Sequence, residues 1–381
     1  MSERSAYAAS GVDVAAGDRA VALMRARVER THGAAEVLAG IGGFAAAVAV
    51  PAGLRDPVMV SATDGVGTKT AIAAALRRFE TIGQDLVAMC ADDVVCAGAR
   101  PLFFLDYLAV GRLEPVAVAE LVGGVAAGCD LAGCALVGGE TAEHPGLMRH
   151  DEFDLAGFCV GVAERAELLD GSAARAGDVL IGLAASGLHA NGFSLVRAVL
   201  AQHDLALDRP YLEVVGGRMD EAASVRIGLD EPEHTLATLG EVLLTPTRIY
   251  ARDVLALREA LAAGGTPLRG LAHITGGGLP GNVPRALPAD LGARLDVRTW
   301  TAPSICALVS ELGGMTPAEM RATLNGGLGM VAVVPAEAAD AACRFLAARG
   351  VRAWSVGEVV PVAALGGARY VEVGGEAGGD G

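Results

Sequence analysis

The sequence predicts an α/β protein with two domains. The chain has 381 residues, enough for two hydrophobic cores. Apolar, strand-like runs alternate with helical segments along it. Its hydrophobic fraction is 52% while its aromatic fraction is 4%, a composition typical of strands buried on both faces of a sheet. We place the domains at residues 1–170 and 171–365 and expect a disordered tail at 366–381.

Composition also excludes several classes of protein. The net charge is −15 without a basic stripe, so we expect no nucleic-acid partner. The first residues lack an apolar signal-like core, and the long apolar stretch 116–139 is interrupted by Glu120 and Asp130, so we expect no membrane segment. Seven cysteines without a CxxC pair indicate buried thiols in a reducing cytoplasm rather than disulfides or a zinc site.

The central pattern is a strand, a glycine turn and a helix at residues 57–76. The apolar run 57–62 predicts a buried strand, and 70–76 predicts a helix. Between them, glycine amides, the helix N-terminus and Lys69 are suited to bind phosphate. Because Asp64 has the wrong charge for bare phosphate, the pattern favours a magnesium nucleotide. The alternative is an ordinary corner with a surface lysine.

Other segments of the first domain carry isolated acids in apolar surroundings. We predict a helix at 18–31 that includes Arg25, a strand at 45–50, a helix at 85–99 and a strand at 102–110. Asp92 and Asp93 in the second helix require a cation or basic partners, unless one is solvated and the other caps a neighbour. Asp106 in the second strand also requires a partner.

Glycine turns recur at strand ends in both domains. Strand 134–137 ends in a Gly-Gly-Glu-Thr turn containing Glu140, at the edge where α/β sheets bind ligands. In the second domain, strand 178–184 leads to a loop with His189 and Asn191. Residues 208–240 resemble a variable loop, and 246–263 a helix. The loop 273–281 matches a dinucleotide fingerprint, but prolines break the helix that this requires, leaving an anion-accepting loop.

Taken together, the motifs resemble those of the phosphoribosylformylglycinamidine cyclo-ligase (aminoimidazole ribonucleotide synthetase) family, from residue 7 to about residue 360. The resemblance depends on the order of many separate segments. These are Gly11–Val14, Asp64–Lys69, Ile82–Met89, Pro101–Tyr107, Gly138–Glu143 with Pro145 and Gly146, Ala156–Gly161, Ser186–Gly192, Pro246–Tyr250 and Thr275–Gly278.

The resemblance implies a fold, a reaction and partners. The fold would be a two-domain α/β (α+β) synthetase whose N-terminal mixed sheet forms a homodimer interface. The reaction would be ATP- and Mg²⁺-dependent closure of formylglycinamidine ribonucleotide to 5-aminoimidazole ribonucleotide through an iminophosphate, in purine biosynthesis. ADP and phosphate would be released.

The resemblance also implies roles for particular residues. It gives catalytic roles to Asp64, Asp93, Glu140 and Arg25 and metal-binding roles to Asp64, Asp93 and Asp106. The nucleotide would contact Gly65, Gly67, Thr68, Lys69, Gly138, Gly139 and Thr141. The substrate would contact His189, Asn191, Thr275, Gly276, Gly277 and Gly278. No residue identifies itself as the general base.

Several positions depart from the family pattern. Arg25 stands where a lysine is frequent, and its planar fork is not equivalent to an ammonium. The others are Asp92 for Asn, His144 for Met, Gly281 for Glu, Gly326 for Cys and Arg100 for an acid. These departures bear on metal affinity and pH optimum more than on the type of reaction.

Two rival functions remain from the sequence. One is a relative that phosphorylates another group, such as a selenophosphate or thiamine-phosphate enzyme or the glutamine-dependent amidotransferase. A selenophosphate enzyme would need a reactive N-terminal cysteine, and the amidotransferase is much longer. The other is a catalytically silent nucleotide-binding or scaffold subunit, which would be expected to lack one of the three acids Asp64, Asp93 and Glu140.

Overall fold

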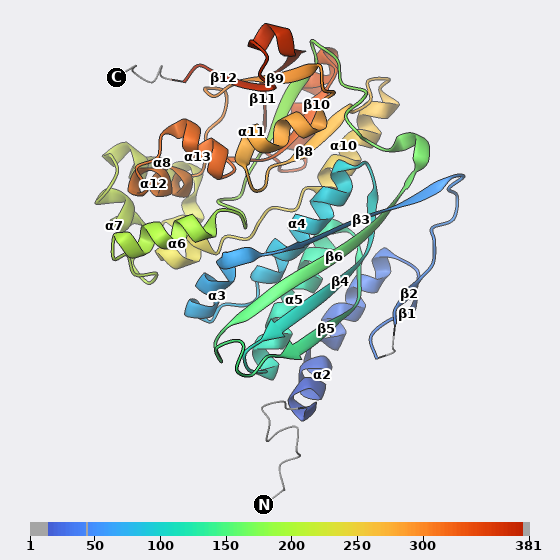
Figure 1. The fold of residues 1–381 in the computed structure, drawn as a ribbon, viewed down its shortest axis with the longest axis vertical. Coiled ribbons are helices and arrows are strands. Elements are labelled where there is room, and N and C mark those ends of the chain that lie inside the picture. The colour runs from blue at the N-terminus through green and yellow to red at the C-terminus, as the bar shows by residue number, and fades with distance from the viewer. Residues whose placement is uncertain (1–13, 43–44, 376–381) are drawn as a thin grey trace, which may run out of the picture. The chain divides into compact units, whose positions relative to one another are not determined.

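A computed structural model describes residues 14–42 and 45–375, which form two compact units (Figure 1). The first unit contains the described residues up to Val95, Ala99–Glu167 and Leu244–Arg252; the second contains Cys96–Gly98, Leu168–Leu243 and the described chain from Asp253. The chain thus leaves the first unit close to the boundary expected after residue 170. It returns to that unit for nine residues, 244–252, which we did not expect.

The first unit is built on a four-stranded mixed sheet. Its elements are α2 (Val14–Thr31), β1 (Val37–Ala39), β2 (Ala47–Val48), β3 (Pro57–Gly65), α3 (Thr70–Leu76), α4 (Ile82–Cys96), β4 (Arg100–Val110), α5 (Pro115–Ala132), β5 (Ala135–Glu143) and β6 (Phe153–Glu164), with short 3-10 turns His32–Ala34, Gly67–Lys69 and Arg165–Glu167. The strand order is β3-β6-β4-β5, and β1 pairs with β2 separately. Only the β4–β5 pair is parallel.

One face of this sheet is covered by helices and the other is open. Helices α4 and α5 run along the covered face (Figure 1), and most of their residues are buried. Exposed and less exposed residues alternate along β3 and along the first half of β6. Met59 of β3, Tyr107 of β4 and Phe158 of β6 are exposed on the face opposite the helices. We expected strands buried on both faces. That expectation was wrong here, because antiparallel neighbours need no crossover helices to cover the second face.

Helix α5 is the one described helix with the length and mean hydropathy, 1.5, of a membrane span, and 61% of it is buried inside the protein. It packs against α2, β4 and β5 within the first unit. Pro115 begins it, and Gly133 in the left-handed region ends it. The burial identifies it as a core helix.

The second unit contains a six-stranded sheet in the order β12-β9-β11-β7-β10-β8, antiparallel except for the β12–β9 pair. Its strands are β7 (Val179–Ala184), β8 (Gly270–His273), β9 (Leu291–Asp296), β10 (Leu328–Val334), β11 (Ala353–Pro361) and β12 (Tyr370–Val373). Its helices are α6 (Phe193–Gln202), α7 (Tyr211–Gly216), α8 (Glu221–Asp230), α9 (Leu239–Leu243), α10 (Ala251–Ala263), α11 (Gly278–Asn282), α12 (Ser304–Leu312), α13 (Pro317–Thr323) and α14 (Ala339–Ala348), with 3-10 turns at Pro232–His234, Val283–Ala286, Ala336–Ala338 and Val362–Leu365. All seven residues of β10 are buried.

Three local expectations for the second unit were wrong. The segment 208–240 contains the short helices α7, α8 and α9, which bury Tyr211 and Ile227. The chain from residue 366 is not a disordered tail as far as residue 375, because β12 hydrogen-bonds in parallel to β9. The helix expected from Pro246 begins at Ala251. The backbone before it is bound by side chains of other elements, as described below.

Candidate functional site

The turn after β3 has the predicted strand–turn–helix form. Asp64 is exposed at the end of β3, where its Oδ1 accepts a hydrogen bond from the Gly65 amide at 2.8 Å. Gly67 has a φ of 68°, which favours glycine, and it begins the 3-10 turn that leads into α3. The sequence therefore folds into a turn that presents a carboxylate next to accessible backbone.

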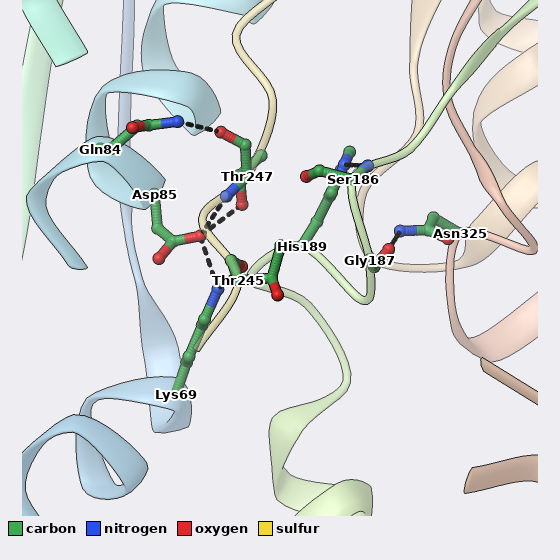
Figure 2. Close-up of polar contacts among 9 residues, drawn as sticks. All are labelled: Lys69, Gln84, Asp85, Ser186, Gly187, His189, Thr245, Thr247 and Asn325. Atoms are coloured by element: carbon green, nitrogen blue, oxygen red, sulfur yellow. Dashed lines mark hydrogen bonds and ion pairs between the residues drawn. The ribbon is translucent and has the colours of Figure 1, made fainter. Parts of the chain in front are cut away.

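Lys69 does not face this turn, so its predicted contact with phosphate needs correction. Its side chain is 0% exposed. Its Nζ lies 2.8 Å from Asp85 Oδ1 and also donates to the Thr245 carbonyl oxygen at 2.8 Å (Figure 2). Burial lowers the pKa of Lys69 and raises that of Asp85, while the contact between the two opposes both shifts. Lys69 is therefore a structural partner of a buried acid.

The same cluster binds the returning segment 244–252. Asp85 Oδ1 also accepts from the Thr247 amide at 2.8 Å and from its hydroxyl, and Gln84 Nε2 donates to the Thr247 carbonyl at 2.9 Å (Figure 2). Asp92 accepts from the Tyr250 amide at 3.0 Å. Asp92 is buried and binds a backbone amide of a neighbouring segment, which is the alternative weighed from the sequence.

Asp93, by contrast, is exposed, and it lies with Asp64 beside one thiol. Burial raises the pKa of Cys90, and the charges of Asp64 and Asp93 raise it further. Within the described part of the chain, no three His, Cys, Asp or Glu side chains are grouped to hold a metal ion. The predicted set Asp64, Asp93 and Asp106 is therefore not a preformed metal site. Asp64 and Asp93 remain neighbours of a common thiol.

Asp106 lies in a different environment. It is 8% exposed and lines a cavity of about 210 Å³ between α2, α5 and β5, together with Gly138, Gly139, Glu140 and Thr141. Burial raises the pKa of the Asp106 carboxyl to about 7. The metal-binding role of Asp106 therefore stays a prediction.

The predicted glycine turn on β5 thus borders that cavity. Glu140 is exposed, and its Oε1 accepts from the Thr141 amide at 3.0 Å. Arg25, the predicted cation of α2, does not line the cavity. Its side chain is 46% exposed and pairs with Glu29, one turn along, at 3.4 Å.

In the second unit, the structure brings two of the predicted substrate loops together. A Cβ added to Gly276 would lie 3.7 Å from Asn191 Oδ1, so these loops are adjacent. Asn282 Nδ2 donates to the Gly276 and Gly278 carbonyl oxygens at 3.1 and 2.9 Å, which fixes the glycine loop from the inside. Thr275 is half-buried and Gly277 is exposed.

His189 is placed differently from the prediction. Its ring is 1% exposed, and Nε2 accepts from the Ser186 amide at 3.2 Å (Figure 2). Asn325 Nδ2 donates to the Gly187 carbonyl oxygen at 2.7 Å, which ties the same loop to the start of β10 (Figure 2). His189 therefore shapes its loop, and its imidazole is not presented for substrate contact.

Two departures from the family pattern have a local explanation. His144 Nε2 is 3.2 Å from the Tyr107 hydroxyl, so the imidazole extends the open face of the sheet. Gly326 has a φ of 60°, a conformation that favours glycine. Nothing in the structure explains Gly281.

Sequence reasoning missed Asp85, Thr247, Asn282 and Asn325. Three of these four bind groups of segments far away in the chain, and such pairs leave no local pattern. Asp85 had one available signal, since a carboxylate in the first turn of a mostly apolar, buried helix must have a partner.

Comparison with known proteins identifies the family. The model described as AIR synthase related protein, N-terminal domain, matches residues 42–163, and the corresponding C-terminal domain model matches residues 175–367. The chain is 50% identical over 356 residues to the phosphoribosylformylglycinamidine cyclo-ligase of Sorangium cellulosum (strain So ce56), covering 93% of this chain and 95% of that protein. It is 49% identical to that of Gloeobacter violaceus (strain ATCC 29082 / PCC 7421), covering 94% and 98%.

Solved structures show the same fold at much lower identity. Thiamine-monophosphate kinase from Stenotrophomonas maltophilia K279a matches with a TM-score of 0.61 and 20% identity, covering 94% of this chain and 97% of that one. Hydrogenase maturation protein HypE in complex with ATP matches with a TM-score of 0.60 and 18% identity, covering 95% and 92%. From its matched domains and its full-length relatives, the chain belongs to the phosphoribosylformylglycinamidine cyclo-ligase family, with the two-domain AIR synthase fold.

Proposed function

We propose that this protein closes the imidazole ring of 5-aminoimidazole ribonucleotide from formylglycinamidine ribonucleotide in purine biosynthesis, with ATP as the second substrate. The observation that supports this proposal is the match to cyclo-ligases at 50 and 49% sequence identity over 93 and 94% of the chain. The matched region includes both domains. The exposed acid and glycine turn after β3 add local support. All seven cysteines are free thiols, which fits a reaction in the cytoplasm.

The chemistry explains why positioning and charge matter more than a strong base. An amide oxygen is a poor leaving group, so the γ-phosphoryl group of ATP is transferred to the formamide oxygen, forming an iminophosphate. The amidine nitrogen then attacks the same carbon, the C–O bond breaks and phosphate leaves. The protein's contribution is to hold both substrates in line and to stabilise negative charge with oriented donors.

Asp64 and Asp93 are the residues that we propose to hold Mg²⁺. Magnesium usually takes one or two protein carboxylates and completes its shell with substrate phosphates and waters, so two exposed acids beside one thiol are sufficient. When bound, the ion would neutralise charge on the triphosphate. Gly65, Gly67 and Thr68 would contact the nucleotide from the same turn.

The glycine loop of the second unit, Thr275–Gly278, and Asn191 are proposed to bind the ribonucleotide substrate. The carbonyls of Gly276 and Gly278 accept hydrogen bonds from Asn282, so the loop is fixed in one conformation. Asn191 Oδ1 lies next to it. A fixed glycine loop with an adjacent side-chain amide suits a small anionic ligand.

A homodimer is the assembly that we propose. Met59, Tyr107 and Phe158 are 53, 41 and 40% exposed on the face of the first sheet opposite α4 and α5. Exposed apolar side chains gathered on one sheet face are typical of an interface. Phe158→Glu is therefore expected to give a monomer in analytical ultracentrifugation. Leu236→Glu, at a 97% exposed position in the second unit, should leave the dimer intact.

The assay that tests the function combines formylglycinamidine ribonucleotide, ATP and Mg²⁺. We expect ADP and aminoimidazole ribonucleotide to form in equal amounts; no substrate-dependent ADP would refute the proposal. Asp64→Asn should lower kcat by about 10²–10³-fold, the loss typical for removal of one stabilising group. Asp56→Asn, at the other end of β3 in an exposed pair with Arg165, should retain activity.

A further inference from the structure

The second unit contains a cavity of its own, with a volume of about 310 Å³. It lies between α8, residues 301–307, where α12 begins, and the beginning of β11. Helices α8 and α12 lie side by side here (Figure 1). The volume is at the lower end of the roughly 300–1,000 Å³ of sites for small molecules. None of the described residues that line it is among those proposed above to bind ATP, Mg²⁺ or the ribonucleotide substrate.

One wall of the cavity is fixed by Glu231. Its carboxylate accepts hydrogen bonds from the Ser304 amide at 2.7 Å and from the Ser304 hydroxyl at 2.6 Å, and it lies 2.9 Å from His234 Nδ1. The hydroxyl of the buried Tyr211 is 2.9 Å from the same Ser304 oxygen. Burial would raise the pKa of Glu231, but hydrogen bonds from His234 and Ser304 lower it. The charge of Glu231 is therefore compensated inside the protein, at the N-terminus of α12.

Two arginines on different elements line the cavity. Arg226 belongs to α8, and Arg352 directly precedes β11. Both side chains are exposed, and within residues 14–42 and 45–375 neither guanidinium group forms a hydrogen bond or an ion pair. A phosphate group offers three oxygen acceptors and nearly two negative charges, so it can bind two guanidinium groups at once. The pair therefore suits a phosphorylated ligand.

Asp230 lies one helical turn after Arg226 and lines the same cavity. This spacing permits an ion pair on a helix, but the order of base before acid is the less favourable one. No such pair forms between these two described residues. Carboxylates accept hydrogen bonds from the hydroxyl groups of ribose. Asp230 thus suits the sugar of a ligand whose phosphate is bound by the arginines.

Trp354 provides a flat surface in the same cavity. The Ala184 amide donates to the Arg352 carbonyl oxygen at 2.9 Å, so the pairing of β11 with β7 extends to Arg352. Residues two apart in an extended strand face the same side, which places Trp354 and Arg352 together along the cavity. The indole is half-buried and packs against the core of the second unit. A planar base can stack on a ring that is held in this way.

We propose that this cavity binds a nucleoside monophosphate. The phosphate lies between Arg226 and Arg352, the base stacks on Trp354, and the ribose hydroxyls donate to Asp230. The site consists of residues of the second unit alone. The inference does not depend on the proposed function, because it invokes neither the reaction nor the residues assigned to it.

The experiment titrates the full-length protein at pH 7 with AMP, adenosine and inorganic phosphate, and follows both the heat of binding and the tryptophan fluorescence. The sequence contains 2 tryptophans, Trp300 and Trp354, so a signal that is lost in Trp354→Leu comes from the cavity. We expect AMP to quench the fluorescence. Adenosine and phosphate should each bind at least about tenfold more weakly than AMP, because each lacks one of the two anchors.

Arg352→Met keeps a long side chain but removes the charge, so AMP should bind about 10–100-fold more weakly, the loss expected for charge-assisted hydrogen bonds. Arg344→Met, at an exposed position of α14 in the same unit, is the matched control and should bind AMP as wild type does. Circular dichroism would check that both variants fold.

Three results would overturn the inference. Equal affinity of Arg352→Met and Arg344→Met for AMP would mean that AMP binds elsewhere on the protein. Adenosine that binds as tightly as AMP would mean that the arginines do not bind the phosphate. AMP binding that leaves the wild-type fluorescence unchanged would mean that no base stacks on Trp354.

Discussion

Two buried carboxyl groups of the first unit, Asp85 and Asp106, have opposite surroundings. Asp85 Oδ1 receives the Lys69 ammonium and both donors of Thr247. Asp106 lines an apolar cavity. Neither its Oδ2 nor that of Asp85 receives a donor from the described residues, so the two acids differ in the side-chain donors at Asp85 Oδ1 and in the cavity beside Asp106. The difference shows that an acid in an apolar segment of the sequence can have either of two roles. An acid bound by side chains of distant segments holds the fold together, whereas an acid that borders a cavity can be reached by a ligand.

The largest expected effect comes from removing the partner of Asp85. Lys69→Met leaves a buried carboxylate without its countercharge, so the free energy of unfolding should fall by about 3–5 kcal/mol. Urea unfolding followed by circular dichroism measures this change. The double variant Lys69→Met/Asp85→Leu should recover much of the loss, because no charge remains buried.

Arg165→Met is the matched control for that prediction. Arg165 pairs with Asp56 at the same 2.8 Å, but both side chains are more than 60% exposed. Its urea midpoint should stay close to that of wild type, because solvent screens exposed pairs. Similar losses for Lys69→Met and Arg165→Met would contradict the contrast between buried and exposed pairs.

A smaller effect distinguishes Asp106 by its dependence on pH. Its pKa is about 7 in the folded protein against 3.8 as the ordinary value, so the unfolded chain loses the proton first as pH rises. The contribution of Asp106 to stability is therefore fully present below about pH 4 and is lost as pH rises to about 7. Asp106→Asn lacks this loss. The free energy of unfolding of Asp106→Asn minus that of wild type should therefore increase by about 2–3 kcal/mol between pH 5 and pH 8.

Urea titrations of both proteins across that range provide the measurement. Asp208→Asn, an exposed acid of the second unit, should keep a constant difference from wild type at every pH. If the difference between Asp106→Asn and wild type were also constant, Asp106 would be ionised in the folded protein at pH 5.

The smallest effect concerns a single hydrogen bond to Asp85. Thr247→Val removes the hydroxyl but leaves the shape and the backbone amide, so the free energy of unfolding should fall by about 1.5 kcal/mol. Thermal unfolding followed by calorimetry can resolve this. Thr299→Val, whose exposed hydroxyl donates to the Asp296 carbonyl, serves as the control and should change little. A zero effect at Thr247 would mean that Lys69 and the Thr247 amide compensate Asp85 without the hydroxyl.

The sequence predicted what is determined locally. Strand β3, the turn with Asp64 and helix α3 follow from an apolar run, glycines and a second apolar run, and α5 follows from Pro115 and its long apolar stretch. These signals lie within one element or between neighbours in the chain. They are therefore visible without knowledge of the packing.

What the sequence could not predict depends on distant partners. Lys69 fits a phosphate turn equally well whether its ammonium points outward or inward, and its direction is set by Asp85 and by Thr245, 176 residues away. Helices α7 and α8 within residues 208–240 are only 6 and 10 residues long, so each spans too few turns to show a clear helical period. Strand β12 is four residues long and is fixed by its neighbour β9.

The nine residues 244–252 have a consequence for any attempt to divide this protein. A fragment cut after residue 170 would retain Lys69, Asp85 and Asp92 but would lack the backbone and hydroxyl of Thr247 and the amide of Tyr250 that bind them. The buried acids and the Lys69 ammonium of that fragment would then lack the hydrogen bonds that residues 244–252 supply. We therefore expect the N-terminal half to be less stable as a separate fragment, and an exchange between homologues should include residues 244–252.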